Sequence, residues 1–262
     1  MPIATKIRAS LQRLYKRALP FELRYWLYKL RNNAETKQLR SKINPSPKGA
    51  FSLKPFDENH CIFVHITKSA GTSVAKSLFG YLPYHYSASQ YRVIYGRKTF
   101  NDYYSFAFVR NPWDRLYSAY SYLKDGGWNA QDKAWAEQNL GECADFNDFV
   151  CNWLTQERLN SHIHFWPQSR FICDRKGRPI IDDIYYFETI ANDFANIAKK
   201  IAKPATLAHT NRSQRESYLD AYNEHSIKKV QALYATDIKN FGYSFNSFNR
   251  QQIDQRAFIN HD

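Results

Sequence analysis

The chain has 262 residues, of which 44% are hydrophobic and 16% aromatic, and its formal net charge is +13. A chain of this length buries enough apolar surface to fold as one compact catalytic domain without disulfides or metals. It contains no run of eighteen apolar residues and no hydrophobic signal core, so we expect neither a membrane-spanning helix nor a secretory leader. Its four cysteines form no C-x-x-C pair and no metal-ligand spacing, which predicts free thiols and no metal site.

Positive charge is concentrated at the N-terminus, where residues 1–48 hold twelve Lys and Arg against two Glu and so carry +10 of the total. The apolar residues of the first half share one helical face: Ile3, Ile7, Leu11 and Leu14. Pro20 interrupts this pattern, and residues 21–30 continue it with Trp26 and several tyrosines. Such a basic amphipathic segment is typical of a helix on an anionic membrane surface. The alternative is a solvated helix that packs on the domain or on a second subunit.

The segment Asn44 to Gly49 is rich in proline and serine and is predicted to be a linker. We therefore expect a basic arm and linker over residues 1–50 and a catalytic domain over 51–262. Nucleic acid is not an expected partner, because the catalytic part is close to charge balance and carries no known binding motif. The sequence leaves the oligomeric state open.

Residues Cys61 to Ser73 read CIFVHITKSAGTS, which predicts a buried strand, a small loop and the start of a helix near Thr72. Backbone N–H groups at a helix start carry partial positive charge and can hold an anion. Lys68 adds a full charge, and Gly71 would let the backbone approach the anion closely. The segment therefore predicts a phosphate-type site, with an ordinary strand–turn–helix as the alternative. The Walker pattern is absent, because the lysine precedes the glycine, and this argues against an ordinary ATPase or GTPase.

Residues Tyr104 to Tyr122 predict a second strand over Ser105–Val109 and a helix from Pro112, capped by Asn111. Arg110 then lies at the carboxyl end of a strand, the usual ligand edge of an open parallel sheet. Ser118 lies two turns along the helix, and an arginine fork with a hydroxyl can hold a phosphate. The alternative is that Arg110 simply pairs with Asp114 at the helix start.

The remaining pattern alternates between helices and a strand. We expect helices over 145–159 and 189–200, a strand over 180–187 and a final amphipathic helix over 227–241. The basic run 175–178 precedes the strand, which favours a hairpin turn over a donor-binding loop. The whole pattern predicts an α/β fold with a central, mostly parallel sheet flanked by helices.

The two phosphate-type segments together resemble the sulfotransferases that use 3′-phosphoadenosine 5′-phosphosulfate (PAPS), specifically the carbohydrate O-sulfotransferases of sulfotransferase family 2. The family's P-K-x-[AG]-G-T-[ST] loop corresponds to residues 67–73, with Thr67 where proline is usual. Its F-V-R-N-P-[WF]-[DE]-R-[LV]-x-S-x-Y segment corresponds to residues 108–120 without a gap. Weaker similarity extends over roughly residues 58–246 and includes the H-x-x-P-Q element at His164–Gln168. The resemblance implies a P-loop-like three-layer fold.

The resemblance also implies roles for the site residues. The 5′-phosphosulfate of PAPS would be held by the loop residues Lys68, Ser69, Ala70, Gly71, Thr72 and Ser73. Arg110 and Ser118 would hold the 3′-phosphate, and Asn211 and Ser213 would line the donor pocket. Lys68 would also stabilise the leaving phosphate during in-line transfer, and no metal is implied.

Transfer to a sugar hydroxyl calls for a general base, because the pKa of that hydroxyl lies far above neutrality. His85 is the first candidate, since the family places a histidine between the two motifs, and a packed loop histidine is the alternative. His164 is the second candidate for the general base. With Trp166, it is also a candidate to contact the acceptor. His65 is expected to be structural. The acceptor is predicted to be a carbohydrate, either a polysaccharide or a glycolipid, contacted by the loops 86–100 and 124–143.

Two other functions remain open at this stage. One is a nucleotide-binding, kinase-like phosphotransferase, which would need a Walker lysine and Mg²⁺ ligands that the sequence does not offer. The other is an inactive, membrane-associated binding protein. Animal members of the family are anchored in the Golgi, and no anchor is visible here. We therefore predict a bacterial cytoplasmic enzyme, with peripheral binding to the inner membrane face through the basic arm as a further expectation.

Overall fold

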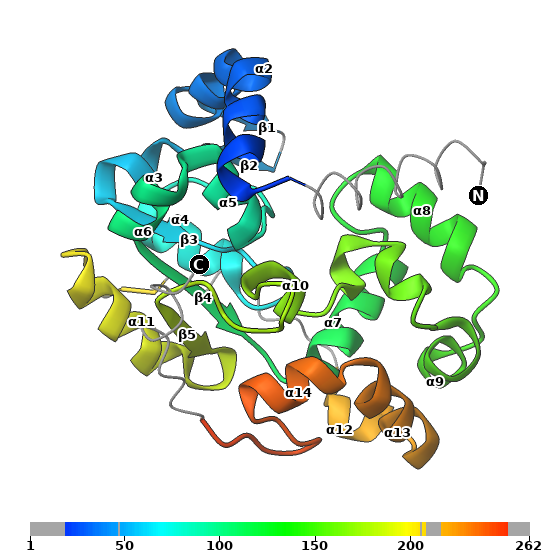
Figure 1. The fold of residues 1–262 in the computed structure, drawn as a ribbon. Helices are drawn as coiled ribbons and strands as arrows, with labels where there is room; N and C mark the ends of the chain where they lie inside the picture. The colour runs from blue at the N-terminus through cyan, green and yellow to red at the C-terminus, as the bar shows by residue number, and fades with distance from the viewer. Residues whose placement is uncertain (1–18, 47, 205, 208–215, 251–262) are drawn as a thin grey trace.

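The computed structural model describes residues 19–46, 48–204, 206–207 and 216–250. Its centre is a parallel sheet in the order β3 (Cys61–Phe63), β4 (Tyr104–Val109) and β5 (Asp183–Tyr186). The register pairs Cys61 with Tyr104 and Phe106 with Asp183. Helices flank this sheet (Figure 1), so the predicted α/β fold with a central parallel sheet is confirmed.

The helices divide into those that surround the sheet and those that form a second, helical part. Around the sheet lie α2 (Phe21–Ser41), α3 (Lys54–Asn59), α4 (Gly71–Phe79), α5 (Ala88–Tyr95), α6 (Arg97–Asp102), α10 (Ser169–Ile172) and α11 (Ile190–Lys200). The other part contains α7 (Pro112–Lys124), α8 (Ala130–Leu140), α9 (Phe146–Asp148), α12 (Tyr218–Ala221), α13 (Glu224–Leu233) and α14 (Ala235–Phe241). A π-helical turn spans Phe149–Trp153, and short 3₁₀ turns lie at Arg158–Asn160, Ile163–Phe165 and Phe187–Thr189.

Each part has its own hydrophobic core. The sheet core is built on the continuous apolar run of β4, which is buried on both faces as expected of a central parallel strand. The second core lies between α7, α8 and α13 and includes Trp113, Phe149 and Tyr234. β4 and α7 are consecutive elements, one in each part, so the short connection at Arg110 and Asn111 lies where the two parts meet (Figure 1).

Several predicted elements are confirmed within one or two residues. They include the first strand, β4, the helix capped by Asn111, and α11. Asn111 accepts a hydrogen bond from the Trp113 N–H at 3.0 Å, as a helix cap does. The turn at 175–178 is also confirmed, because Cys173 pairs with Pro179 and the Asp174 N–H bonds to the Arg178 carbonyl at 2.8 Å. All four cysteines are free.

Two predicted helices are wrong in extent. The helix expected over 145–159 ends at Trp153, its second half is a π-helical turn, and the backbone becomes extended at Leu154. The Thr155 hydroxyl then accepts a hydrogen bond from the Arg158 N–H, which starts a separate turn. The final helix is two helices that break at Tyr234, whose buried hydroxyl donates to the Phe165 carbonyl at 2.8 Å.

The N-terminal region is also more structured than a linker. The strands β1 (Asn44–Ser46) and β2 (Gly49–Phe51) form a small hairpin, and the Leu82 N–H bonds to the Ala50 carbonyl at 2.9 Å. α2 begins directly after Pro20, as the interruption in the pattern predicted. The amphipathic segment containing Ile3 to Leu14 lies outside the described residues. Within the described ranges, every helix is too short or too polar to cross a membrane.

Candidate functional site

The loop between β3 and α4 has an unusual backbone. Lys68 and Ala70 both adopt left-handed conformations, with φ of 65° and 57°, which side-chain-bearing residues rarely do. The left-handed Ala70 is followed directly by the right-handed first turn of α4. This alternation turns successive N–H groups toward one side and is typical of anion-binding loops at helix starts. The predicted loop and helix start are therefore present, with Thr72 and Ser73 half-buried in the first turn.

Gly71 is required for a reason that the sequence did not reveal. A Cβ atom at this position would lie 1.8 Å from the His65 ring, so the glycine makes room for a buried imidazole. His65 in turn stacks on Phe63, with ring centroids 5.7 Å apart. Its predicted structural role fits this packing, which fixes the start of α4 against the end of β3.

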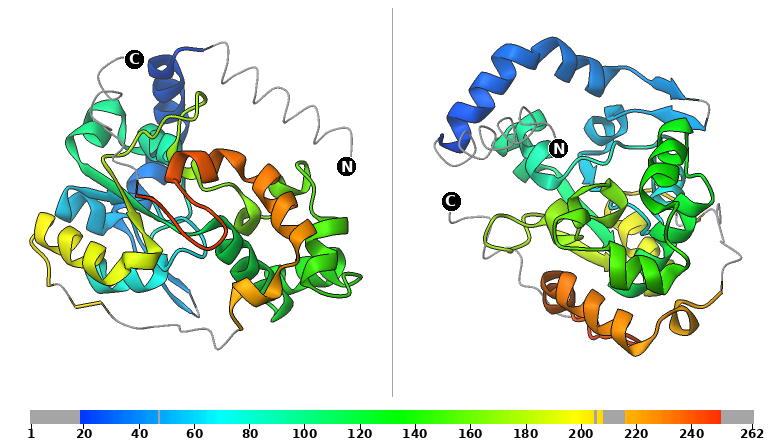
Figure 2. Two further views of the ribbon diagram at one scale, coloured as in Figure 1. Left: turned by 90° about the horizontal axis from the view of Figure 1, so that it is seen from below. Right: turned by 90° about the vertical axis from the view of Figure 1, so that its right-hand side faces the viewer.

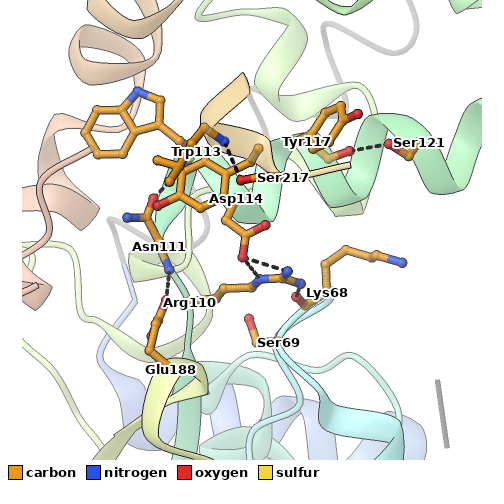
Figure 3. Close-up of polar contacts among 12 residues, drawn as sticks. Lys68, Ser69, Arg110, Asn111, Trp113, Asp114, Tyr117, Ser121, Glu188 and Ser217 are labelled. Carbon is orange, nitrogen blue, oxygen red and sulfur yellow. Dashed lines mark hydrogen bonds and ion pairs between the residues drawn. The ribbon is translucent and has the colours of Figure 1, made fainter. Parts of the chain in front are cut away.

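Arg110 joins the two predicted phosphate segments. Its guanidinium donates to the Asp114 carboxylate at 2.7 Å and to the Lys68 carbonyl at 3.0 Å, as Figure 3 shows. It also lies over the Phe187 ring, 4.1 Å from the centroid, and the residue is only 8% exposed. The Arg110–Asp114 pair considered from the sequence is thus present. This pair holds the guanidinium beside the Lys68 loop. Pairing with Asp114 is therefore compatible with the predicted role of Arg110 as a phosphate ligand.

The buried side chain of Gln168 fixes the backbone between β4 and α7 at Arg110. Its side-chain amide accepts from the Arg110 N–H at 2.9 Å and donates to the Arg110 carbonyl at 2.8 Å, as a neighbouring strand would. The Ser69 hydroxyl lies 3.5 Å from the same amide oxygen. Behind it, fully buried Asp237 accepts the N–H groups of Gln168 and Ser169 at 2.6 and 2.8 Å. Burial raises the pKa of Asp237, while these donors and the nearby Arg115 oppose that rise.

A second buried arginine, Arg115, holds the Lys68 loop from the other side. It donates from Nε to the Thr67 carbonyl at 2.8 Å, from Nη2 to the Thr67 hydroxyl at 3.0 Å, and from Nη1 to the Trp166 carbonyl at 2.8 Å. Thr67 stands where the family usually has proline. Its hydroxyl is a partner of the arginine fork, so hydrogen bonds hold the loop in place of a rigid ring.

The Lys68 side chain points away from Arg110 (Figure 3), and its ammonium lies over the Tyr122 ring at 4.0 Å from the centroid. The Tyr122 hydroxyl donates to Asp132 at 2.9 Å. The same carboxylate lies 3.5 Å from Nε2 of His162. A cation–π contact therefore places the Lys68 ammonium beside a group of ionisable side chains outside the phosphate loop.

Four histidines, His65, His85, His162 and His164, gather on this side of the loop. The His85 ring lies 4.3 Å from His65, and His164 packs edge-on against Tyr122 at 4.8 Å. Burial lowers the pKa of His85, and burial together with the charges of His162, Lys68 and His85 lowers the pKa of His164 well below its ordinary value. Both rings are therefore neutral at pH 7.

Half-buried His85 has a defined tautomer. Its Nδ1 lies 3.0 Å from the His65 carbonyl oxygen. Because a carbonyl oxygen only accepts, this bond requires the proton on Nδ1 and leaves Nε2 as the basic nitrogen. The residue thus has the form that a general base needs.

The other predicted residues fall into three groups. Ser118 is buried on α7, and Trp166 is half-buried with the Arg170 guanidinium 3.5 Å from its ring centroid. Tyr91 and Tyr95, in the loops expected to contact the acceptor, are instead core residues of α5. Asn211 and Ser213 lie outside the described residues.

Sequence reasoning missed the residues that hold the site together. Arg115 and Gln168 both lay within quoted motifs, but their side chains were not given roles. Asp132 lay in a segment expected to be a loop and Asp237 in the expected final helix, whereas His162 lay between the helix expected over 145–159 and the H-x-x-P-Q element. The available signal was the buried context: a charged or amide side chain inside an otherwise apolar helical face usually has a specific partner.

Within the part of the chain that the structure describes, no three His, Cys, Asp or Glu side chains are grouped as metal ligands. The protein thus has an α/β fold in which a left-handed loop at a helix start lies beside an arginine at the end of the adjacent parallel strand. Comparison with known proteins makes the class specific. The model of the sulfotransferase family matches residues 54–244, and the chain belongs to this family.

Other comparisons add little about function. A protein of Archaeoglobus fulgidus that is named as uncharacterized is 34% identical over 113 residues, which cover 43% of this chain and 78% of that protein. No solved structure matches. The family establishes a sulfotransferase-type transferase domain, and sulfotransferases generally use PAPS as the sulfate donor.

The packing of His65 on Gly71 gives a first test. Gly71→Ala should destabilise the protein by about 1–3 kcal/mol, because the new methyl group overlaps the imidazole. In a His65→Ala background the same substitution should cost much less, since the ring is gone. Denaturant unfolding of the four proteins measures both values. An equal cost in both backgrounds would contradict the packing described here.

The Thr67–Arg115 bond gives a second test. Thr67→Val keeps the shape of the side chain but leaves a buried guanidinium N–H without its acceptor, so stability should fall by about 1–3 kcal/mol. Thr67→Ser retains the hydroxyl and is the matched control. The free energy of unfolding is measured in urea. Equal stability of the valine and serine variants would contradict the role of the Thr67 hydroxyl as the acceptor for Arg115.

Proposed function

We propose that the protein transfers a sulfuryl group from PAPS to a hydroxyl of a carbohydrate acceptor. One observation carries this proposal: the Arg110 guanidinium donates to the Lys68 carbonyl, so the two segments predicted to bind phosphate lie side by side. A donor with a 5′-phosphosulfate and a 3′-phosphate needs two anion sites at a fixed separation. Two rigid, adjacent elements meet that requirement.

The residues present fit such a donor. The loop at 68–73 would hold the 5′-phosphosulfate through its N–H groups, assisted by the hydroxyls of Thr72 and Ser73. Arg110 and Ser118 would hold the 3′-phosphate, with the arginine already oriented by Asp114 and Phe187. When bound, the donor supplies the sulfuryl group, and adenosine 3′,5′-bisphosphate leaves.

Lys68 would stabilise the negative charge that develops on the leaving phosphate. Its ammonium is mobile on a four-carbon chain, and its contact with Tyr122 is a weak cation–π interaction that an anionic group can replace. This role requires the side chain to swing from Tyr122 toward the loop. By analogy with phosphoryl transfer, the protein's contribution is mainly positioning and charge stabilisation.

His85 would accept the proton of the acceptor hydroxyl at Nε2. The His65 carbonyl fixes its tautomer, and its lowered pKa keeps the ring unprotonated at neutral pH. His164 and Trp166 come from the H-x-x-P-Q segment and are candidates to contact the acceptor. A carbohydrate is supported by the half-buried Tyr86, next to His85 in the chain, and by the half-buried Trp128, whose backbone N–H donates to Asp132, because aromatic side chains suit sugar rings.

The donor assignment is tested by calorimetric titration with adenosine 3′,5′-bisphosphate in the absence of Mg²⁺. Binding should require the 3′-phosphate, so ADP and ATP should bind at least about tenfold more weakly. Arg110→Ala should weaken binding by about 10–100-fold, because it removes charge-assisted hydrogen bonds. Arg158→Ala, which removes an exposed arginine elsewhere, is the control. Equal binding of ADP would instead favour the kinase-like phosphotransferase.

The pH dependence tests the base. Since only the neutral ring can accept a proton, kcat/KM should rise with pH through an apparent pKa below the ordinary imidazole value of about 6.5 and then level off. Activity is therefore lost as the pH falls through that pKa. His85→Asn should lower kcat by about 10²–10⁴-fold and leave the affinity for adenosine 3′,5′-bisphosphate unchanged. His225→Asn, on the exposed face of α13, is the control, and a wild-type profile in the His85 variant would exclude this residue as the base.

A further inference from the structure

The outer face of α2 carries an exposed apolar stripe. Leu23, Trp26 and Leu30 are 41%, 55% and 64% exposed, among the largest values for hydrophobic side chains in the described ranges. Their spacing of three and four residues places them on one side of the helix. The opposite side is occupied, because Tyr28 packs against the sheet core and Tyr25 lies against Gly96. The stripe thus remains outside the fold, and Figures 1 and 2 show α2 along the periphery of the molecule.

A basic groove adjoins the same helix. It has a volume of about 310 Å³ and lies between the N-terminal half of α2, the helices α5 and α6, and the turn at 174–178. The cationic side chains that line it are Arg24, Arg92, Arg97, Arg175, Lys176 and Arg178. Two carboxylates face them: Asp174 pairs with Arg178 at 2.7 Å, and Glu22 lies 3.4 Å from Arg97. Among the described residues, cationic side chains therefore outnumber carboxylates in the groove beside the apolar stripe.

We infer that this surface, consisting of the α2 stripe and the basic groove, docks on an anionic lipid bilayer. The stripe would enter the interfacial region, where tryptophan and leucine are favourable, and the groove would face lipid phosphates. Lys29 and Arg31 are exposed next to Leu30 on α2 and add charge at the level of the headgroups. The docking does not depend on the proposed sulfuryl transfer.

Charge argues against the other occupants. Residues 19–48 hold seven Lys and Arg against two Glu, so two copies that met through this face would bring like charges together. The phosphates of a nucleic acid could contact the cationic side chains of the groove, but Trp26 and Leu30 would remain in water. An anionic bilayer satisfies both the apolar and the cationic parts of the surface. The exposed side chains of Arg175 and Lys176 extend that match beyond the helix.

The full-length protein can be tested by co-sedimentation with phosphatidylcholine vesicles that contain either no phosphatidylglycerol or about one third of it. Binding is expected only to the anionic vesicles, and it should weaken as salt is raised. Trp26→Ser/Leu30→Ser should lower the partition coefficient at least about tenfold through loss of apolar burial. Arg175→Gln/Lys176→Gln should lower it about tenfold through loss of charge.

Each variant has a matched control elsewhere on the surface. Leu219→Ser removes an exposed leucine from α12, and Lys228→Gln/Lys239→Gln removes two exposed lysines from α13 and α14. These controls should bind like the wild type. Absent binding of the wild type to anionic vesicles, or unchanged binding of the Trp26/Leu30 variant, would overturn the inference. It would also be overturned if sedimentation velocity showed a wild-type dimer that the same variant converts to a monomer. Matching thermal melts show that the variants are folded.

Discussion

The site depends on the hydrogen bonds that Gln168 makes to both backbone groups of Arg110. These bonds continue the sheet beyond the last residue of β4 with a side chain, and they fix the point where the chain passes from the sheet into α7. A buried amide that lost either bond would leave polar groups unsatisfied, at a cost of about 1–3 kcal/mol each. Asp237 holds the backbone of Gln168 in place, so α14, far along the chain, determines the position of Arg110.

The Lys68 loop is held by the same kind of interaction. Arg115 joins Thr67 to Trp166, and Arg110 joins the Lys68 carbonyl to Asp114. The two left-handed residues of the loop store strain that such contacts must offset. The loop is thus held by the protein's own contacts, as the proposed positioning of a charged donor requires. The side chains proposed to act in catalysis lie outside these contacts, since the Lys68 ammonium lies over the Tyr122 ring and the His85 ring lies against His65.

Much of this arrangement could be predicted from local sequence. Three short segments carry the signals for their own structure: the apolar run of β4, the Asn111-Pro112 start of α7 and the glycine-bearing loop. The strand and the helix predicted from the first two are both present. What could not be predicted depends on distant partners. The break at Tyr234 is accompanied by its bond to Phe165, and Gly71 is needed because His65 occupies the space of a side chain. Neither partner is visible in the local pattern of either segment.

The most direct test of the account is a crystal structure with adenosine 3′,5′-bisphosphate. The 5′-phosphate should lie on the N–H groups of residues 68–73 and the 3′-phosphate on Arg110 and Ser118, with the Arg110–Lys68 and Gln168–Arg110 bonds retained. The Lys68 ammonium should leave Tyr122 for the 5′-phosphate. A nucleotide bound elsewhere, or a 3′-phosphate without contact to Arg110, would contradict the claim that the two segments form one donor site.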